Sequence, residues 1–172
     1  TTIDGTAQFV TINSAGTNDA AVLSSDTKNL TETDAVLTSS GTLTISDVDS
    51  AATYQAQTIG GTYGSLTIAT NGAWIYTASS AHDEFVAGSS YQDIFTVRSA
   101  DNTTSTVTIN IAGTNDAPVV SNIAINGSVI SFDVTDPDNS SLSLSSNLAS
   151  RFGSPSIEND ASNSITASQQ SP

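Results

Sequence analysis

The sequence has no cysteine, no methionine and only 3 basic side chains among its 172 residues. Without cysteine there can be no disulfide framework, no thiolate chemistry and no cysteine-ligated zinc site. Against the 3 Lys and Arg residues stand 17 Asp and Glu residues, so the formal net charge is −14. A surface that binds nucleic acid or an anionic membrane needs clustered Lys and Arg, and these two partner classes are therefore excluded.

Long apolar runs and helix-forming residues are also scarce. No apolar stretch approaches the length of a membrane span, so membrane insertion is not expected. The sequence has 29 Ser and 25 Thr but only 8 Leu, a composition that favours strands over amphipathic helices. It therefore predicts an all-β protein. The chain begins Thr-Thr without an initiator Met or a signal segment, and we expect it to be an excised piece of a longer protein.

One segment of the sequence occurs twice, 97 residues apart. Residues 4–24 and 101–121 are identical at fourteen of twenty-one positions, and both copies contain Gly-Thr-Asn-Asp-Ala. This spacing suits a string of β-sandwiches of roughly 100 residues each. The predicted divisions are 1–19 as the last strand and linker of a preceding repeat, 20–116 as a complete domain, and 117–172 as the start of a further β domain, truncated or complete, with a polar tail at 159–172 that frays.

Alternating apolar residues bounded by turn residues predict about seven strands in the complete domain. The strongest hairpin signal is Asn71-Gly72, because both turn positions favour a positive φ. Trp74, Tyr76 and Phe95 are predicted in the core, and one capped helical turn is expected at 80–86. The predicted strands lie near 20–24, 41–46, 53–58, 64–69, 73–77, 91–99 and 103–112.

The order of the motifs resembles the VCBS repeat of large bacterial surface adhesins that are secreted with RTX-type C termini. The motifs are Leu-Thr-Glu-Thr-Asp-Ala at 30–35, Gly-Thr-Leu-Thr-Ile-Ser-Asp-Val-Asp at 41–49, Gly-Thr-Tyr-Gly-Ser-Leu-Thr-Ile at 61–68, Asn-Gly-Ala-Trp-Ile-Tyr-Thr at 71–77 and Gly-Thr-Asn-Asp-Ala-Pro at 113–118. The resemblance implies tandem Ig-like or cadherin-like antiparallel β-sandwiches, calcium binding, and an extracellular role as a spacer or adhesive module in cell-surface attachment and biofilm formation. Ala21 departs from the family pattern, which has proline there, as the second copy does at Pro118.

Acidic residues are predicted to converge at both ends of the complete domain, because successive strands alternate in direction. Where the chain enters the domain, at the N-terminal junction, the predicted ligands are Asn18, Asp19, Asp47, Asp49 and Asp101. Where it leaves, at the C-terminal junction, they are Glu32, Asp34, Asn115, Asp116, Asp136 and Asp138. Asp83 and Glu84 can approach this second group.

Each group brings carboxylates together with hardly any Lys or Arg to neutralise them, which is repulsive without a cation. Calcium accepts roughly six to eight oxygen ligands in irregular geometry, and Asp, Glu and Asn side chains supply such oxygens. The sequence therefore predicts Ca²⁺ as the bound ion. An acidic, cysteine-free chain that is weakly stable without calcium suits one-step export by type I secretion and folding at the bacterial cell surface.

Catalysis is not predicted. His82 is the single histidine, and it lacks the second histidine one helical turn away that a zinc protease needs. A serine triad around His82 stays an open alternative that a serine-rich sequence cannot test, and the simpler expectation is an exposed loop residue. Lys28 is expected in a polar loop.

Two non-enzymatic functions remain. In the first, the repeats are spacers that calcium stiffens at each junction. In the second, the chain is a calcium-dependent carbohydrate-binding or protein-binding module, for which Tyr54, Tyr63, Tyr91 and Phe152 are the candidate aromatic platforms. The expected partners are neighbouring repeats of the same chain and surface glycans or proteins, and the chain is expected to be a monomer.

Overall fold

The structure is a computed structural model of the chain and describes residues 3–5, 7, 9–126, 129–139, 156–159 and 164–168. These residues form strands, turns and irregular segments, and none of them is helical. None of the described residues belongs to a helix that could span a membrane. The all-β prediction is confirmed.

Residues 20–116 form a β-sandwich of two sheets with a short strand pair beside them. One sheet has the order β2-β9-β8, the other has the order β3-β7-β6-β5, and β1 pairs with β4. The strands are β1 (Val22–Leu23), β2 (Asp26–Thr31), β3 (Thr38–Thr42), β4 (Ile45–Ser46), β5 (Gln57–Gly60), β6 (Gly64–Ile68), β7 (Ala73–Ala78), β8 (Ser90–Arg98) and β9 (Thr104–Ala112).

The core lies between the two sheets and is built from alternate residues of their strands. Trp74 and Tyr76 on β7 face Phe95 on β8 and Ile109 on β9, and all four side chains are buried. In a strand, successive side chains point to opposite faces, so these period-2 sequences bury one face and leave the other to water. The predicted core residues are therefore confirmed.

Strand β2 was not predicted, and it changes the topology. It pairs in parallel with β9, from Asp26 opposite Val107 to Thr31 opposite Ala112. The prediction of a wholly antiparallel sandwich is wrong for this pair, and Lys28 lies on a strand rather than in a loop. Because the half-buried positions of β2 include Asp26 and Lys28, whose charged groups pair at 3.2 Å, the sequence shows no apolar alternation here.

Three other predicted elements differ from the structure. The strand expected at 41–46 is divided between β3 and β4, because Leu43 turns into the core and its N–H bonds the Gly72 carbonyl at 3.0 Å. The strand expected at 53–58 reduces to a single bridge between Tyr54 and Ser99, and β5 begins only at Gln57. The expected helical turn is a non-helical turn, closed by the Phe85 N–H and the His82 carbonyl at 2.9 Å.

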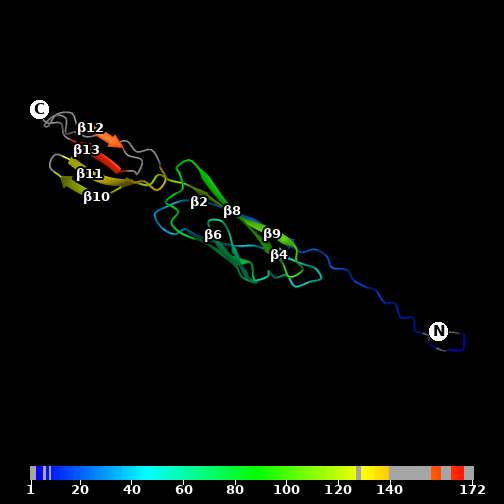
Figure 1. The fold of residues 1–172 in the computed structure, drawn as a ribbon. Coiled ribbons are helices and arrows are strands. Elements are labelled where there is room, and N and C mark those ends of the chain that lie inside the picture. The colour runs from blue at the N-terminus through cyan, green and yellow to red at the C-terminus, as the bar shows by residue number, and fades with distance from the viewer. Residues whose placement is uncertain are drawn as a thin grey trace.

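A further sheet follows the sandwich along the chain. It contains β10 (Val119–Asn126), β11 (Val129–Thr135), β12 (Ser156–Asn159) and β13 (Ser164–Ser168), in the order β10-β11-β13-β12. Figure 1 shows this sheet beyond one end of the sandwich, while the N-terminal segment runs outward from the opposite end. The expectation of a frayed tail is wrong for 164–168, since β13 pairs with both β11 and β12.

Candidate metal centre

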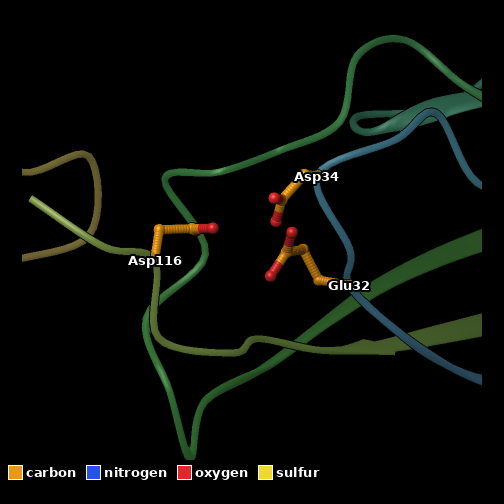
Figure 2. A group of neighbouring side chains, drawn as sticks. All are labelled: Glu32, Asp34 and Asp116. Carbon is orange, nitrogen blue, oxygen red and sulfur yellow. The ribbon is translucent and has the colours of Figure 1, made fainter. Parts of the chain in front are cut away.

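Three carboxylates converge where β2 and β9 end. Glu32 follows β2 directly, and its N–H bonds the carbonyl of Ala112, the last residue of β9, at 2.8 Å. Because the two strands are parallel, the chain segments that follow them leave the sheet at the same edge. Glu32, Asp34 and Asp116 thereby offer carboxylate oxygens that all lie within 4.8 Å of one another. Figure 2 shows the three side chains pointing toward one another.

Several oxygens at this junction are buried without a hydrogen-bond donor. Glu32 is only 1% exposed; its Oε2 accepts bonds from the Thr114 N–H and hydroxyl, and its Oε1 has no hydrogen-bond partner among the described residues. One oxygen of Asp116 and one of Asp138 are likewise buried and unpaired among the described residues. A buried carboxylate oxygen without a partner is costly, so these atoms are the candidate ligands for a cation at this junction.

The electrostatics of Asp116 reflect the same crowding. Burial raises the pKa of its carboxyl group, and the negative charges of Glu32, Asp83, Asp34 and Asp138 raise it further. Ionisation of Asp116 is therefore less favourable than that of an ordinary aspartate, and a nearby divalent cation would oppose this effect.

The described basic side chains lie elsewhere. Lys28 pairs with Asp26 and sits 5.6 Å from the Trp74 ring centroid. Arg98 is at the end of β8 that pairs with Thr104, the start of β9, whereas the acidic group follows the last residue of β9. Arg151 lies outside the described residues. Neither described basic residue neutralises the acidic group.

The loop after β11 is tied to the linker that leaves the sandwich. Asp136 accepts bonds from the N–H groups of Asp138 and Asn139 at 3.3 and 3.0 Å. The Asn139 amide donates to Asn115 at 3.2 Å, and the Asn115 amide donates to the Asp116 carbonyl at 2.9 Å. These contacts bring Asp138 close to Asp116, so the sequence-predicted residues of the C-terminal junction lie together.

The N-terminal junction repeats this arrangement. Asp47 accepts bonds from the N–H groups of Asp49 and Ser50 at 3.0 and 2.7 Å, as Asp136 does 89 residues later. The Ser50 hydroxyl donates to Asn18 at 2.7 Å, and the Asn18 amide donates to the Asp19 carbonyl at 2.9 Å. The Asp19 N–H also bonds Asp49 at 3.0 Å. The same loop-to-linker contacts therefore occur at both ends of the sandwich.

Asp101 belongs to the N-terminal junction but is already saturated with donors. It accepts bonds from the Ala21 N–H at 3.0 Å, from both the N–H and the hydroxyl of Thr103, and from Ser99. The Asn18 amide adds a weaker contact at 3.4 Å. These bonds, led by that of Ser99, hold the pKa of Asp101 well below its usual range. In this geometry Asp101 anchors the incoming linker and its own turn.

Among the described residues, Glu32, Asp34 and Asp116 are the group of three whose carboxylates come close enough to share an ion. The N-terminal junction has one comparable atom, the buried and unpaired Oδ2 of Asp47. The sequence did not predict Ser50 and Asn139, whose side chains donate to the linker residues Asn18 and Asn115. It also did not predict Thr114, which donates to Glu32. Thr114 had a usable signal, because it recurs in the repeat as Thr17.

The prediction that His82 is an exposed loop residue is wrong. Its side chain is buried and stacks on Phe85 at 4.5 Å between ring centroids, with the Tyr63 ring edge-on to both. Nδ1 lies 2.8 Å from a Glu84 oxygen, and Nε2 lies 2.8 Å from the Tyr63 carbonyl. Both nitrogens thus face acceptors, an arrangement that suits the doubly protonated ring. Glu84 is engaged here and not in the acidic group.

We expect the His82 ring to titrate above its usual value of 6.5. Burial alone would lower the pKa of His82, but the bonds to Glu84 and the Tyr63 carbonyl, with the charges of Glu84 and Asp93, raise it. A raised folded-state pKa stabilises the fold below the unfolded pKa, and this contribution is lost as pH rises through the folded value. NMR can follow the single histidine directly. Glu84→Gln should move the midpoint down, and a midpoint at or below 6.5 in both proteins would refute the assignment.

Two solved structures are partly similar to the chain. The chain resembles the human desmocollin-1 ectodomain with a TM-score of 0.42 and 16% identity, over 91% of this chain and 32% of that one. It resembles a protocadherin gammaB7 EC3-6 cis-dimer structure with a TM-score of 0.44 and 16% identity, over 89% and 40%. The chain thus spans well under half of either protein. No curated protein matches the sequence.

The family comparison is more specific. Residues 18–113, which are 96 of the 172 residues, match the bacterial cadherin-like domain. The match covers the sandwich from its incoming linker to the residue after β9, and it indicates no catalytic family. The resemblance predicted from the motifs is confirmed at this level, while membership of the VCBS group stays a prediction. The chain belongs to the family of bacterial cadherin-like domains.

Proposed function

We propose that the chain is a calcium-stabilised extracellular repeat of a bacterial adhesin. It acts as a spacer between the parts of that adhesin on either side of it. The observation that carries this proposal is the set of buried, unpaired carboxylate oxygens of Glu32, Asp116 and Asp138 between the sandwich and the next sheet. A cation held there contacts both structural units at once. It therefore fixes their relative orientation as well as removing the repulsion.

The donor set favours calcium among the common cations. It contains carboxylate oxygens of Glu32, Asp34 and Asp116, with Asp138 close by. Hard oxygen ligands suit calcium and magnesium, but magnesium demands near-ideal octahedral geometry and keeps several waters. The absence of cysteine and the engagement of the single histidine leave no soft ligand for zinc or copper.

The spacer reading is favoured over a glycan-binding module for residues 20–116. Of the candidate aromatic platforms, Tyr54 is 2% exposed, and Tyr63 and Tyr91 pack edge to face at 5.6 Å in a cluster with Phe85. Phe152 lies outside the described residues. A flat aromatic surface for a sugar ring is therefore not available from these tyrosines. Neighbouring repeats are the partners that this proposal requires.

The same proposal includes an extracellular location, a longer RTX-type adhesin of which this chain is a repeat, and type I secretion. Calcium is scarce inside cells and abundant outside, so a fold that depends on a calcium junction completes itself after export. Surface glycans or proteins as final ligands, biofilm formation, and a monomeric state belong to the expected role of the parent adhesin. The VCBS motif order supports that role.

Replacing both aspartates of the loop after β11 tests the junction. Asp136→Ala with Asp138→Ala removes the Asp138 carboxylate, whose charge acts on Asp116, and the Asp136 carboxylate, which accepts the N–H groups that hold the loop. We therefore expect a lower calcium stoichiometry and a broader interdomain distance distribution in small-angle scattering. In chelator, where no calcium is bound, the melting of residues 20–116 should change little, because their core does not involve this loop. Asp133→Ala is the control, since Asp133 bonds Asn122 within the same sheet. A double variant that keeps its calcium count and rigid shape would refute the junction role.

A further inference from the structure

The N-terminal segment carries the sequence of β9 without its partners. Val-Thr-Ile-Asn at 10–13 is identical to 107–110. Val107 and Ile109 are 0% exposed in β9, whereas Val10 and Ile12 are each 86% exposed. Residues 9–20 pair with no strand of the described structure. The same four residues are therefore packed between neighbouring strands at 107–110 and exposed at 10–13.

The turn that precedes each copy is also the same. Asp4-Gly5 aligns with Asp101-Asn102, the turn between β8 and β9. Gly5 has a φ of 85° and Asn102 has a φ of 70°, so both backbones are in the left-handed region. The segment thus approaches 10–13 through the kind of turn that leads a hairpin into its last strand.

A glycine gives a third, independent indication. Gly113 lies against the carbonyl oxygens of Phe85 and Val86, and a Cβ atom there would overlap both. Gly16 stands at the same place in the repeat, but a Cβ atom there would have no atom of the described residues within 4 Å. No contact of the described chain requires a glycine at 16. A strand in the position that β9 occupies does require a glycine there.

We propose that residues 4–17 form the last strand of a second sandwich of this type, inserted between a parallel strand like β2 and an antiparallel strand like β8. The partner is a polypeptide with the fold of residues 20–100 that ends just before Asp4. Val10 and Ile12 enter its core. Thr17 takes the place of Thr114, which donates to Glu32.

Asn13 has the side chain that this strand position requires. Its counterpart Asn110 donates to Asn29 at 2.8 Å and accepts from Gln92 at 2.7 Å, which joins β9 to both neighbouring strands. Ser14 is the main departure, because it replaces Ile111, which is fully buried. In this position residues 4–17 therefore bury fewer apolar groups than β9, so a sandwich completed by them is less stable than the same sandwich completed by β9.

The test extends the full chain by joining a second copy of residues 20–100 directly to Asp4. We expect the amides of 10–13 to exchange with solvent deuterium at least about 100-fold more slowly than in the unextended chain. A reference protein has the same extension, with residues 4–19 replaced by the sequence of 101–116. If this reference protects its last strand and the native 4–19 does not, the proposal is wrong.

Two variants separate seating from other causes of protection. Val10→Asp with Ile12→Asp should abolish the slow exchange while leaving the melting of 20–116 unchanged. Gly16→Ala should lower the melting of the added unit in the extended chain and have no effect in the unextended chain. Equal tolerance of Gly16→Ala in both chains would overturn the proposal. So would protection of 10–13 in the unextended chain that rises with concentration, because the strand would then pair with another copy.

Discussion

The melting temperature of the chain is expected to fall by roughly 10–20 °C when calcium is removed with a chelator. An ion that binds only the native state stabilises it by about 2.7 kcal/mol at a free concentration one hundred times the dissociation constant. In a domain of about 100 residues, 1 kcal/mol shifts the melting temperature by about 4–8 °C. Scanning calorimetry in millimolar calcium and in chelator measures the difference.

Magnesium at the same concentration is the matched control for this experiment. It supplies the same charge but tolerates irregular oxygen cages poorly, so it should recover only a small part of the stability. Equal melting temperatures in chelator and in calcium would show that the cation does not stabilise the fold.

Glu32→Gln is expected to change stability in opposite directions with and without calcium. In calcium, the variant loses a ligand charge, and we expect calcium affinity to fall on the order of tenfold to hundredfold, or roughly 1.4–2.8 kcal/mol. In chelator, it removes a buried negative charge that faces Asp34 and Asp116, so the melting temperature should rise above that of the unmodified chain. The Gln carbonyl oxygen can still accept the bonds from Thr114.

Asp26→Asn controls for the change in net charge. Asp26 lies on β2 beside Lys28, away from the acidic group, and its replacement should not alter calcium affinity. Titration calorimetry and melting in both conditions give the comparison. A Glu32→Gln variant that is destabilised equally in calcium and in chelator would mean that Glu32 has only a packing role through Thr114.

The longer strands could be predicted from sequence because their apolar residues alternate. On β6 to β9, one face is buried and the other meets water, so Leu66 to Ile68 and Val107 to Ile111 show the period directly. Strand β2 could not be found in this way. Of its three half-buried side chains only Leu30 is apolar, while Asp26 and Lys28 pair with each other, so no apolar alternation marks this strand.

Much of the candidate site could be predicted from the sequence, because the repeat placed the two linkers at opposite ends of one domain. Two details could not be predicted. The donors that saturate Asp101 come from Ala21, Ser99 and Thr103, and the sequence gives no measure of how many of them a given turn will supply. His82 is buried because its ring stacks on Phe85 and meets acceptors on both sides, which only the folded loop brings together.

A calcium titration by calorimetry on the chain and on its Glu32→Gln, Asp116→Asn double variant tests the central claim most directly. We predict that the unmodified chain binds calcium with a defined stoichiometry and that the double variant loses at least one site, because Glu32 and Asp116 supply buried oxygens to the same group. Equal stoichiometry and affinity in the two proteins would contradict the account. These carboxylates would then be structural residues of the junction and not its metal ligands.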